Sequence, residues 1–289
     1  MKPTGASVSS NDARALVDGN LQPITRTKSV RIDDALGRVL SRGSPPLNEG
    51  TVLDAPGIGV LASHGLKNVE VYVKPKVAVI PFGDEIVPLG RKLKKGQCYD
   101  INTHTVAAVV NNNGGEAYSF QAMGERADIV RGTVAEALQF DLIVISDGSS
   151  KGETDLLTAV LDGWGRVLFN GVRTCPREQI FLSIVDGKPV VAIPGSPALC
   201  LLAAYLLVLP AVRKMAHLPP CETVSVPLGR KVRGDSGCRF LTVKIRNGKV
   251  VSASEPDTLT GIANADGYIE IPENTDGMEK GKLVAVTLF

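Results

Sequence analysis

Between residues 76 and 217, short runs of β-branched and apolar residues alternate with segments whose apolar residues recur every three or four positions. The runs lie at 77–83, 117–123, 142–146, 167–172 and 189–195, and the periodic segments lie at 102–112, 127–138, 153–163 and 197–217. This alternation predicts an α/β fold with a doubly wound, mostly parallel sheet and helices on both faces. The runs are continuously apolar, as expected for strands covered on both sides.

The regions on either side of this α/β domain have different patterns. We expect an N-terminal helical segment over 1–72, the α/β domain over 73–217 and a small all-β C-terminal domain over 218–289. Within the first segment, two short helices are predicted between residues 8 and 42, the second over residues 32–40 with Asp33 as its N-cap. Short alternating runs separated by turn residues indicate the β domain.

The charge balance argues against a nucleic-acid partner. The chain has 32 basic and 30 acidic residues and a net charge of +2, whereas duplex-binding domains usually have a clear basic excess. The one basic cluster, Arg91–Lys95, is typical of a solvated loop. His64, His104 and His217 match no zinc-ligand spacing.

Cysteine usage and the apolar segments predict a cytoplasmic protein without membrane contact. The five cysteines, Cys98, Cys175, Cys200, Cys221 and Cys238, include no Cys-x-x-Cys pair, which favours a reducing compartment. Residues 1–12 lack the apolar run of a signal peptide. The most apolar stretch, 198–212, is shorter than the ~20 residues that cross a bilayer and is predicted to be a core helix.

Three polar loops follow predicted strands, at 83–85, 146–155 and 194–197. In open α/β sheets, ligands bind beyond the carboxyl ends of the strands, and all three loops leave such ends. We therefore expect the three loops to gather at one edge of the sheet.

The loop over 146–155 has the composition of an anion site. It contains Gly148, Ser149, Ser150, Lys151 and Gly152. Glycines let a ligand approach the backbone closely, and the N–H groups at the start of the next helix attract anions such as phosphate. A plain turn is the alternative, because Glu153 and Asp155 would stabilise the start of that helix through its dipole.

The other two loops also allow two interpretations. Asp84 and Glu85 suit a metal ion or the amine donors of a heterocycle, but they also suit an acidic turn. Residues 194–197, Pro194, Gly195, Ser196 and Pro197, form a stiff turn into a helix, where Pro197 fits the first helical position. The free N–H groups of such a turn could brace a flat ligand.

Taken in order, four motifs resemble the MoeA/gephyrin E-domain family of molybdopterin molybdotransferases. These motifs are G-D-E-I-V, K-K-G-Q-C-Y-D-I-N-T, S-D-G-S-S-K-G-E-T-D and I-P-G-S-P, spread over residues 76–217. The resemblance implies insertion of molybdenum from molybdate into molybdopterin, with hydrolysis of an adenylylated pterin. It also implies a MogA/MoeA-type molybdopterin-binding domain, Mg²⁺ as an accompanying ion, a homodimer, and other cofactor-biosynthesis proteins as partners.

The resemblance also assigns roles to residues. It implies that Glu85, Glu125 and Asp155 are catalytic, with Glu125 standing where the family has an aspartate, and that Glu85 and Asp155 are metal ligands. The pterin ligand would be held by Asp84, Gly148, Ser149, Ser150, Lys151, Gly152, Pro194, Gly195, Ser196 and Pro197.

Three departures from the family pattern stand out. After Pro45–Pro46 the chain lacks the Met-Asp-Gly-Tyr-Ala motif and the lid domain that follows it in the family. The family's Lys-Pro-Gly-Lys-Pro motif is replaced by residues 175–179, C-P-R-E-Q, so both lysines are lost. Asp147 stands where the family has glycine and adds negative charge beside the expected anion site.

These departures leave three functions open. The chain is a molybdotransferase, a carrier or sensor that binds molybdopterin without turnover, or a pterin adenylyltransferase like the related MogA-type domains. The MogA-type domains also lack the lid, but their Gly-Gly-Thr-Gly loop matches S-D-G-S-S poorly.

Overall fold

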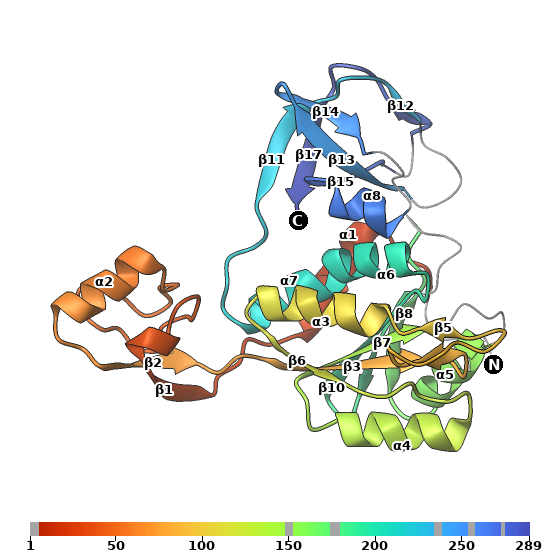
Figure 1. Cartoon of the computed structure of the whole chain (residues 1–289), viewed down its shortest axis with the longest axis horizontal. Coiled ribbons are helices and arrows are strands. Elements are labelled where there is room, and N and C mark those ends of the chain that lie inside the picture. The colour runs from red at the N-terminus through yellow and green to blue at the C-terminus, as the bar shows by residue number, and fades with distance from the viewer. Residues whose placement is uncertain (1–5, 148–152, 174–179, 234–238, 254–257, 273–274) are drawn as a thin grey trace.

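A computed structural model describes residues 6–147, 153–173, 180–233, 239–253, 258–272 and 275–289. Its described residues form three bodies, each with its own apolar core (Figure 1). The central body is the α/β domain, the second is a β domain at the C-terminus, and the third is a small unit that projects from the α/β domain.

The α/β domain is built on a six-stranded sheet in the order β6-β3-β7-β10-β9-β8. Its strands are β3 (Lys76–Phe82), β6 (Glu116–Ser119), β7 (Leu142–Asp147), β8 (Arg166–Asn170), β9 (Phe181–Val185) and β10 (Lys188–Ile193). The strands β6, β3, β7 and β10 are parallel neighbours, as the sequence pattern predicts. Strand β9 is antiparallel to both of its neighbours, which makes the sheet mixed.

Strand β9 was not predicted, although the sequence carries a signal for it. It joins β10 through Asp186 and Gly187, whose φ angles of 47° and 77° are both positive. An Asp-Gly pair between two apolar runs is a strong signal for a two-residue hairpin.

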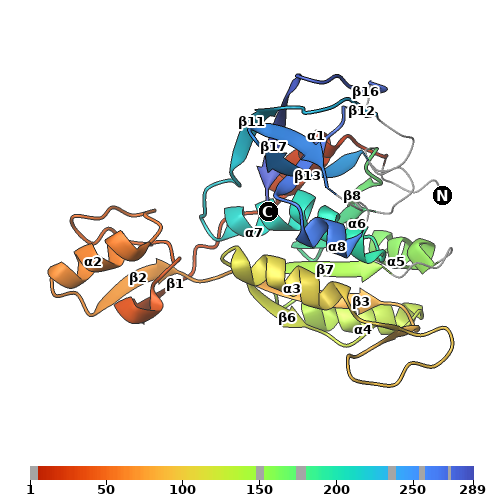
Figure 2. The same ribbon diagram turned by 45° about the horizontal axis from the view of Figure 1, so that its top comes forward.

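Helices cover both faces of this sheet (Figures 1 and 2). One face packs against α1 (Ser10–Asn20), α3 (Asn102–Asn112), α6 (Pro197–Ala203) and α7 (Leu209–Met215). The other face packs against α4 (Ala127–Ala137) and α5 (Glu153–Asp162). The strand side chains alternate accordingly: in β7, Leu142 and Val144 face the first group, and Ile143 and Ile145 face the second.

The apolar helix predicted over 197–217 is present but is not a uniform α-helix. A π-helical segment, η2 (Ala204–Val208), separates α6 from α7, just before Pro210. Proline lacks an N–H group and its ring collides with the carbonyl four residues earlier, so the helix must widen or bend there. The span 197–215 is long and apolar enough to cross a membrane, but 67% of its apolar window is buried inside the protein, as for a core helix.

The C-terminal domain contains the predicted antiparallel strands. Its five-stranded sheet has the order β11-β17-β15-β13-β14, formed by β11 (Thr223–Pro227), β13 (Phe240–Arg246), β14 (Lys249–Ser252), β15 (Gly267–Glu270) and β17 (Leu283–Leu288). Strands β12 (Val232–Arg233) and β16 (Gly277–Met278) pair separately. One short helix, α8 (Leu259–Ala263), was not anticipated.

The structure of the projecting unit shows that the prediction of a second N-terminal helix over 32–40 was wrong. Its elements are β1 (Thr27–Arg31), a 3₁₀ turn η1 (Ile32–Asp34), α2 (Ala55–Ser63) and β2 (Asn68–Tyr72). The expected helix over 32–40 ends after its first turn, because Val39 and Leu40 instead bridge to Val52 and Val71. Asp33 lies inside the turn and pairs with Arg31, so it is not an N-cap.

A stacked ring pair marks the junction between the projecting unit and the α/β domain. The rings of Tyr72 and His217 lie 3.6 Å apart with an interplanar angle of 12°. His217 Nε2 donates to the carbonyl of Ile24 at 2.8 Å, and the Tyr72 hydroxyl donates to Glu49 at 2.9 Å.

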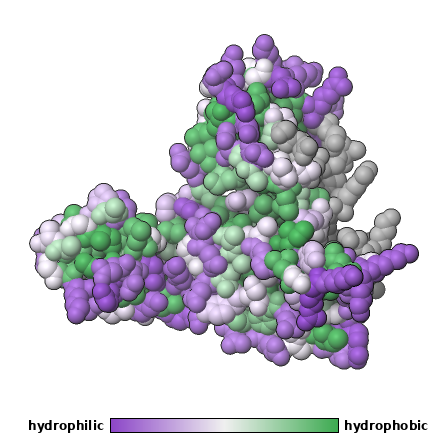
Figure 3. Space-filling view, in the orientation of Figure 1, coloured by the Kyte–Doolittle hydropathy of each residue, from purple (hydrophilic) through white to green (hydrophobic). Residues whose placement is uncertain are grey.

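Apolar residues are also present on the surface of the projecting unit (Figure 3). One of its residues, Leu36, is 66% exposed.

In the loop between β3 and α3, two short parallel strands, β4 (Ile86–Val87) and β5 (Cys98–Tyr99), form a separate ribbon. The basic cluster Arg91–Lys95 lies between these strands and is exposed, as expected for a solvated loop.

Leu142→Ala should lower the free energy of unfolding by about 2–5 kcal/mol, because the side chain is fully buried in the central strand and its loss leaves a cavity. Urea unfolding followed by circular dichroism measures this change. Leu36→Ala, at an exposed position, should change it by less than about 0.5 kcal/mol. Equal effects of the two substitutions would contradict the assignment of β7 to the core.

Candidate functional site

The strand register brings the predicted loops to one edge of the sheet. Phe82 at the end of β3 is the partner of Asp147 in β7, and Ser146 is the partner of Ile193 at the end of β10. The three strands are parallel, so the chain leaves all of them at their carboxyl ends. The segments that follow Phe82, Asp147 and Ile193 therefore start side by side, as the sequence predicts.

The first of these segments turns sharply at Gly83. Its φ angle is 145°, which side chains rarely adopt, and a Cβ atom there would lie 2.5 Å from Glu85 Oε2. Glycine thus allows the carboxylate of Glu85 to fold back over the strand end. Glu85 is half-buried, and Asp84 beside it is exposed.

Glu125 joins this loop from the connection between β6 and α4. Met123 forms a parallel bridge with Phe82, and the N–H of Gly83 donates to the Met123 carbonyl at 3.1 Å. The N–H of Asp84 then donates to Glu125 Oε1 at 3.4 Å. The structure therefore gathers Asp84, Glu85 and Glu125, and we call these three residues the acidic cluster.

The turn over 194–197 lies at the same edge and begins α6. Pro194 is buried, Ser196 is exposed as the N-cap residue, and Pro197 occupies the first helical position. The Ser196 side chain makes no capping hydrogen bond, and its carbonyl accepts from the N–H of Cys200 at 2.7 Å.

Asn102, at the start of α3, was not assigned a role from the sequence. Its Nδ2 donates to the Gly195 carbonyl at 2.8 Å, which ties the start of α3 to the 194–197 turn. In the described part of the chain, Asn102 Oδ1, Thr103 Oγ1 and Ser146 Oγ are buried without a hydrogen-bond partner. The Y-D-I-N-T motif contains Asn102, but its spacing does not reveal the contact with Gly195.

Several predicted site residues lie outside the described residues. These are Gly148, Ser149, Ser150, Lys151 and Gly152, together with residues 175–179, which align with the family's lysine motif. Asp155 lies in the first turn of α5, but the position of its side chain is not described. Within the described ranges, no three His, Cys, Asp or Glu side chains are grouped to hold a metal ion.

The acidic cluster affects the neighbouring thiol. The N–H of Cys98 donates to the Glu85 carbonyl at 3.0 Å. Partial desolvation raises the pKa of Cys98, although the residue is exposed, and the negative charges of Glu85 and Asp100 raise that pKa further. The edge therefore offers carboxylate oxygens, which accept hydrogen bonds from amine groups or bind cations, beside a thiol held in its neutral form.

Family models match most of the chain. A model described as a probable molybdopterin binding domain matches residues 78–214, and one described as the MoeA C-terminal region (domain IV) matches residues 226–289. The two matches are consecutive and have the order of the α/β and β domains. The chain belongs to the MoeA family.

Curated relatives of this MoeA-family chain are considerably longer than it. A molybdopterin molybdenumtransferase of Haemophilus influenzae is 30% identical over 181 residues, 62% of this chain and 45% of the relative. A putative molybdopterin biosynthesis protein of Methanocaldococcus jannaschii is 27% identical over 269 residues, 88% of this chain and 65% of the relative. The chain thus spans between about half and two-thirds of the length of these relatives.

Two solved structures have the same fold. A molybdopterin biosynthesis MoeA protein of Pyrococcus horikoshii has a TM-score of 0.83 at 22% identity, covering 98% of this chain and 99% of the other. A molybdenum cofactor biosynthesis protein of Pyrococcus furiosus has a TM-score of 0.75 at 23% identity, covering 98% and 100%. These likenesses confirm the predicted α/β sheet with a C-terminal β domain.

Removal of the Glu85 charge should increase the reactivity of Cys98. Because Glu85 helps to raise the pKa of Cys98, Glu85→Gln should lower that pKa and speed alkylation by iodoacetamide at a fixed pH. Peptide mapping by mass spectrometry across a pH series measures the rate at Cys98. Glu136→Gln, an exposed position on α4, is the matched control and should leave the rate unchanged. An unchanged rate in Glu85→Gln would place the carboxylate away from the thiol.

Proposed function

We propose that this MoeA-family chain acts in molybdenum cofactor biosynthesis as a molybdotransferase, inserting molybdate into molybdopterin. The observation that supports the proposal is that strands β3, β7 and β10 end side by side next to the acidic cluster, in a chain that matches two consecutive MoeA-type family models. The similarity to named molybdopterin molybdenumtransferases favours this function over a carrier or an adenylyltransferase.

The proposed ligand is molybdopterin, held across the carboxyl edge of the sheet. A pterin is flat and rich in N–H donors, and ionised carboxylates are acceptors only, so Asp84 and Glu125 suit its amine groups. The stiff turn from Pro194 to Pro197 would pack against one face of the pterin ring. We propose that residues 148–152 hold the phosphate, since a Gly/Ser loop before a helix is a common phosphate site.

The proposed chemistry has two parts: hydrolysis of an adenylylated pterin and transfer of molybdate to its dithiolene. Glu85 and Asp155 are the proposed ligands of Mg²⁺, which would supply charge stabilisation to the phosphate oxygens when bound. The acidic cluster places negative charge at this edge, although its three carboxylates are not grouped as metal ligands among the described residues, so Asp155 would have to complete the Mg²⁺ site. Glu125 is the proposed base that orients and deprotonates the attacking water.

Because the chain departs from the family at the two lysines and at the lid, other groups must bind the anion and exclude water from the site. We propose that Lys151 and Arg177 take part in anion binding in place of the two lysines. Arg173 is less suited, because its Nη1 already donates to the Ser7 carbonyl at 3.1 Å. We further propose a cytoplasmic homodimer, in which a second copy or another protein of the pathway covers the open edge and excludes water, which strengthens electrostatic stabilisation.

A reconstitution assay tests the proposal. Purified chain, molybdate and adenylylated molybdopterin should yield active cofactor, measured by activation of a cofactor-free molybdoenzyme. Glu125→Gln should lower the initial rate about 100-fold, as expected for loss of a general base, while Glu136→Gln should retain the wild-type rate.

Three results would overturn the proposal. No yield with pterin still bound would make the chain a carrier, and adenylylated pterin formed from ATP would make it an adenylyltransferase. Full activity of Glu125→Gln would remove the acidic cluster from the reaction. A thermal unfolding midpoint matched to wild type shows that a slow variant is folded.

A further inference from the structure

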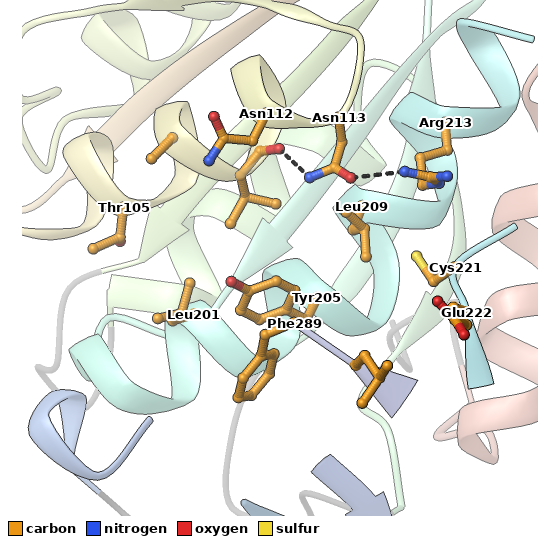
Figure 4. A pocket seen from close by; sticks show the side chains of 13 residues that line it. Thr105, Asn112, Asn113, Leu201, Tyr205, Leu209, Arg213, Cys221, Glu222 and Phe289 are labelled. Carbon is orange, nitrogen blue, oxygen red and sulfur yellow. Dashed lines mark hydrogen bonds between the residues drawn. The ribbon is translucent and has the colours of Figure 1, made fainter. Parts of the chain in front are cut away.

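A cavity with a volume of about 580 Å³ lies between the α/β domain and the C-terminal domain (Figure 4). It is lined by side chains of α3, of the α6–η2–α7 helix, of the segment before β11 and of the end of β17. None of the residues proposed to hold the pterin lines it. The volume lies within the ~300–1,000 Å³ typical of small-molecule sites.

One side of this cavity is apolar and aromatic. The rings of Tyr205 and Phe289 lie 4.5 Å apart with an interplanar angle of 34°, and Leu201 and Leu209 lie beside them (Figure 4). Burial raises the pKa of Tyr205, so the phenol stays neutral at physiological pH. This side can accept an apolar or aromatic group but offers no charge.

The other side carries two opposite charges. Arg213 and Glu222 both line the cavity, away from Leu201 and Phe289 (Figure 4). Arg213 is held in place because its Nε donates to the Pro219 carbonyl at 2.7 Å and its Nη1 to Asn113 Oδ1 at 3.0 Å. Asn113 is itself anchored, since its Nδ2 donates to the Val109 carbonyl at 2.8 Å.

The two charges do not neutralise each other. In the described part of the chain, no ion pair within 4.0 Å joins Arg213 to Glu222, and the Glu222 carboxylate has no hydrogen-bond partner. The Nη2 group of Arg213 likewise has no described partner. A cation and an anion that face one cavity without pairing leave room for a molecule that carries both charges.

We propose that this cavity binds a small zwitterion, an amino acid with an apolar side chain. Arg213 donates to the carboxylate, for which a fixed guanidinium is well suited, and Glu222 accepts from the ammonium group. The apolar side chain lies against Tyr205 and Phe289. Arg213 belongs to α7, whereas Glu222 follows the linker that leads to β11, so the ligand would bridge the two domains.

Isothermal titration calorimetry of the full chain tests this proposal, with L-phenylalanine as the probe. L-Phenylalanine should bind, whereas 3-phenylpropionate, which lacks the ammonium group, and 2-phenylethylamine, which lacks the carboxylate, should each bind about tenfold or more weakly. No heat with millimolar L-phenylalanine overturns the proposal, and so does equal binding of the three compounds.

Glu222→Gln locates the site. Glu222 is exposed, and its substitution should weaken L-phenylalanine binding about tenfold. Binding of 3-phenylpropionate should be unchanged, since that compound has no ammonium group. Glu136→Gln, on the opposite face of the sheet, should bind L-phenylalanine as wild type does. Unchanged binding in Glu222→Gln, or equal weakening in both variants, overturns the assignment. The measurement needs no cofactor synthesis, so its outcome is independent of the proposed molybdotransferase activity.

Discussion

The parallel hydrogen bonding of β3, β7 and β10 is the constraint on which the candidate site depends. In a parallel sheet, neighbouring strands end together, and here Phe82, Asp147 and Ile193 end at adjacent positions. The segments that leave these strands therefore start next to one another, and the fixed part of the candidate site is the sheet edge itself. The β7 side chains are buried on both faces, and a shift by one residue would exchange Leu142 and Val144 with Ile143 and Ile145 between two separately packed cores.

The sequence predicted those features that follow from local periodicity. Continuous apolar runs and helical spacing reveal the order of strands and helices in the α/β domain, and hence the edge at which the three loops lie. Contacts between residues far apart in the sequence could not be predicted from local periodicity. Glu125 reaches the Asp84 N–H only because Met123 bridges to Phe82, a pairing between residues 41 positions apart. The prediction of a helix over 32–40 was wrong for a related reason: Val39 and Leu40 bridge to Val52 and Val71, and local spacing does not reveal these long-range partners.

The C-terminal domain is attached to the α/β domain through α1 as much as through the linker after α7. Glu270 of β15 accepts a hydrogen bond from Ser10 at 2.7 Å and pairs with Arg14, while Phe240 and Tyr268 pack into the apolar core of the α/β domain. Helix α1 thus holds both domains together, although it precedes the projecting unit in the chain. The cavity beside Arg213 is lined from both domains, by α3 and the α6–η2–α7 helix on one side and by Glu222, Leu288 and Phe289 on the other.

The projecting unit closes on itself, and this has a consequence for the history of the family. Strands β1 and β2 form a two-stranded sheet of their own, with an apolar core distinct from that of the α/β domain. The chain leaves and re-enters the larger domain at neighbouring points, near Ile24 and Val73. Segments between these points can therefore be gained or lost during evolution without disturbing the sheet edge, which makes the unit a natural place for the length differences between this chain and its longer relatives.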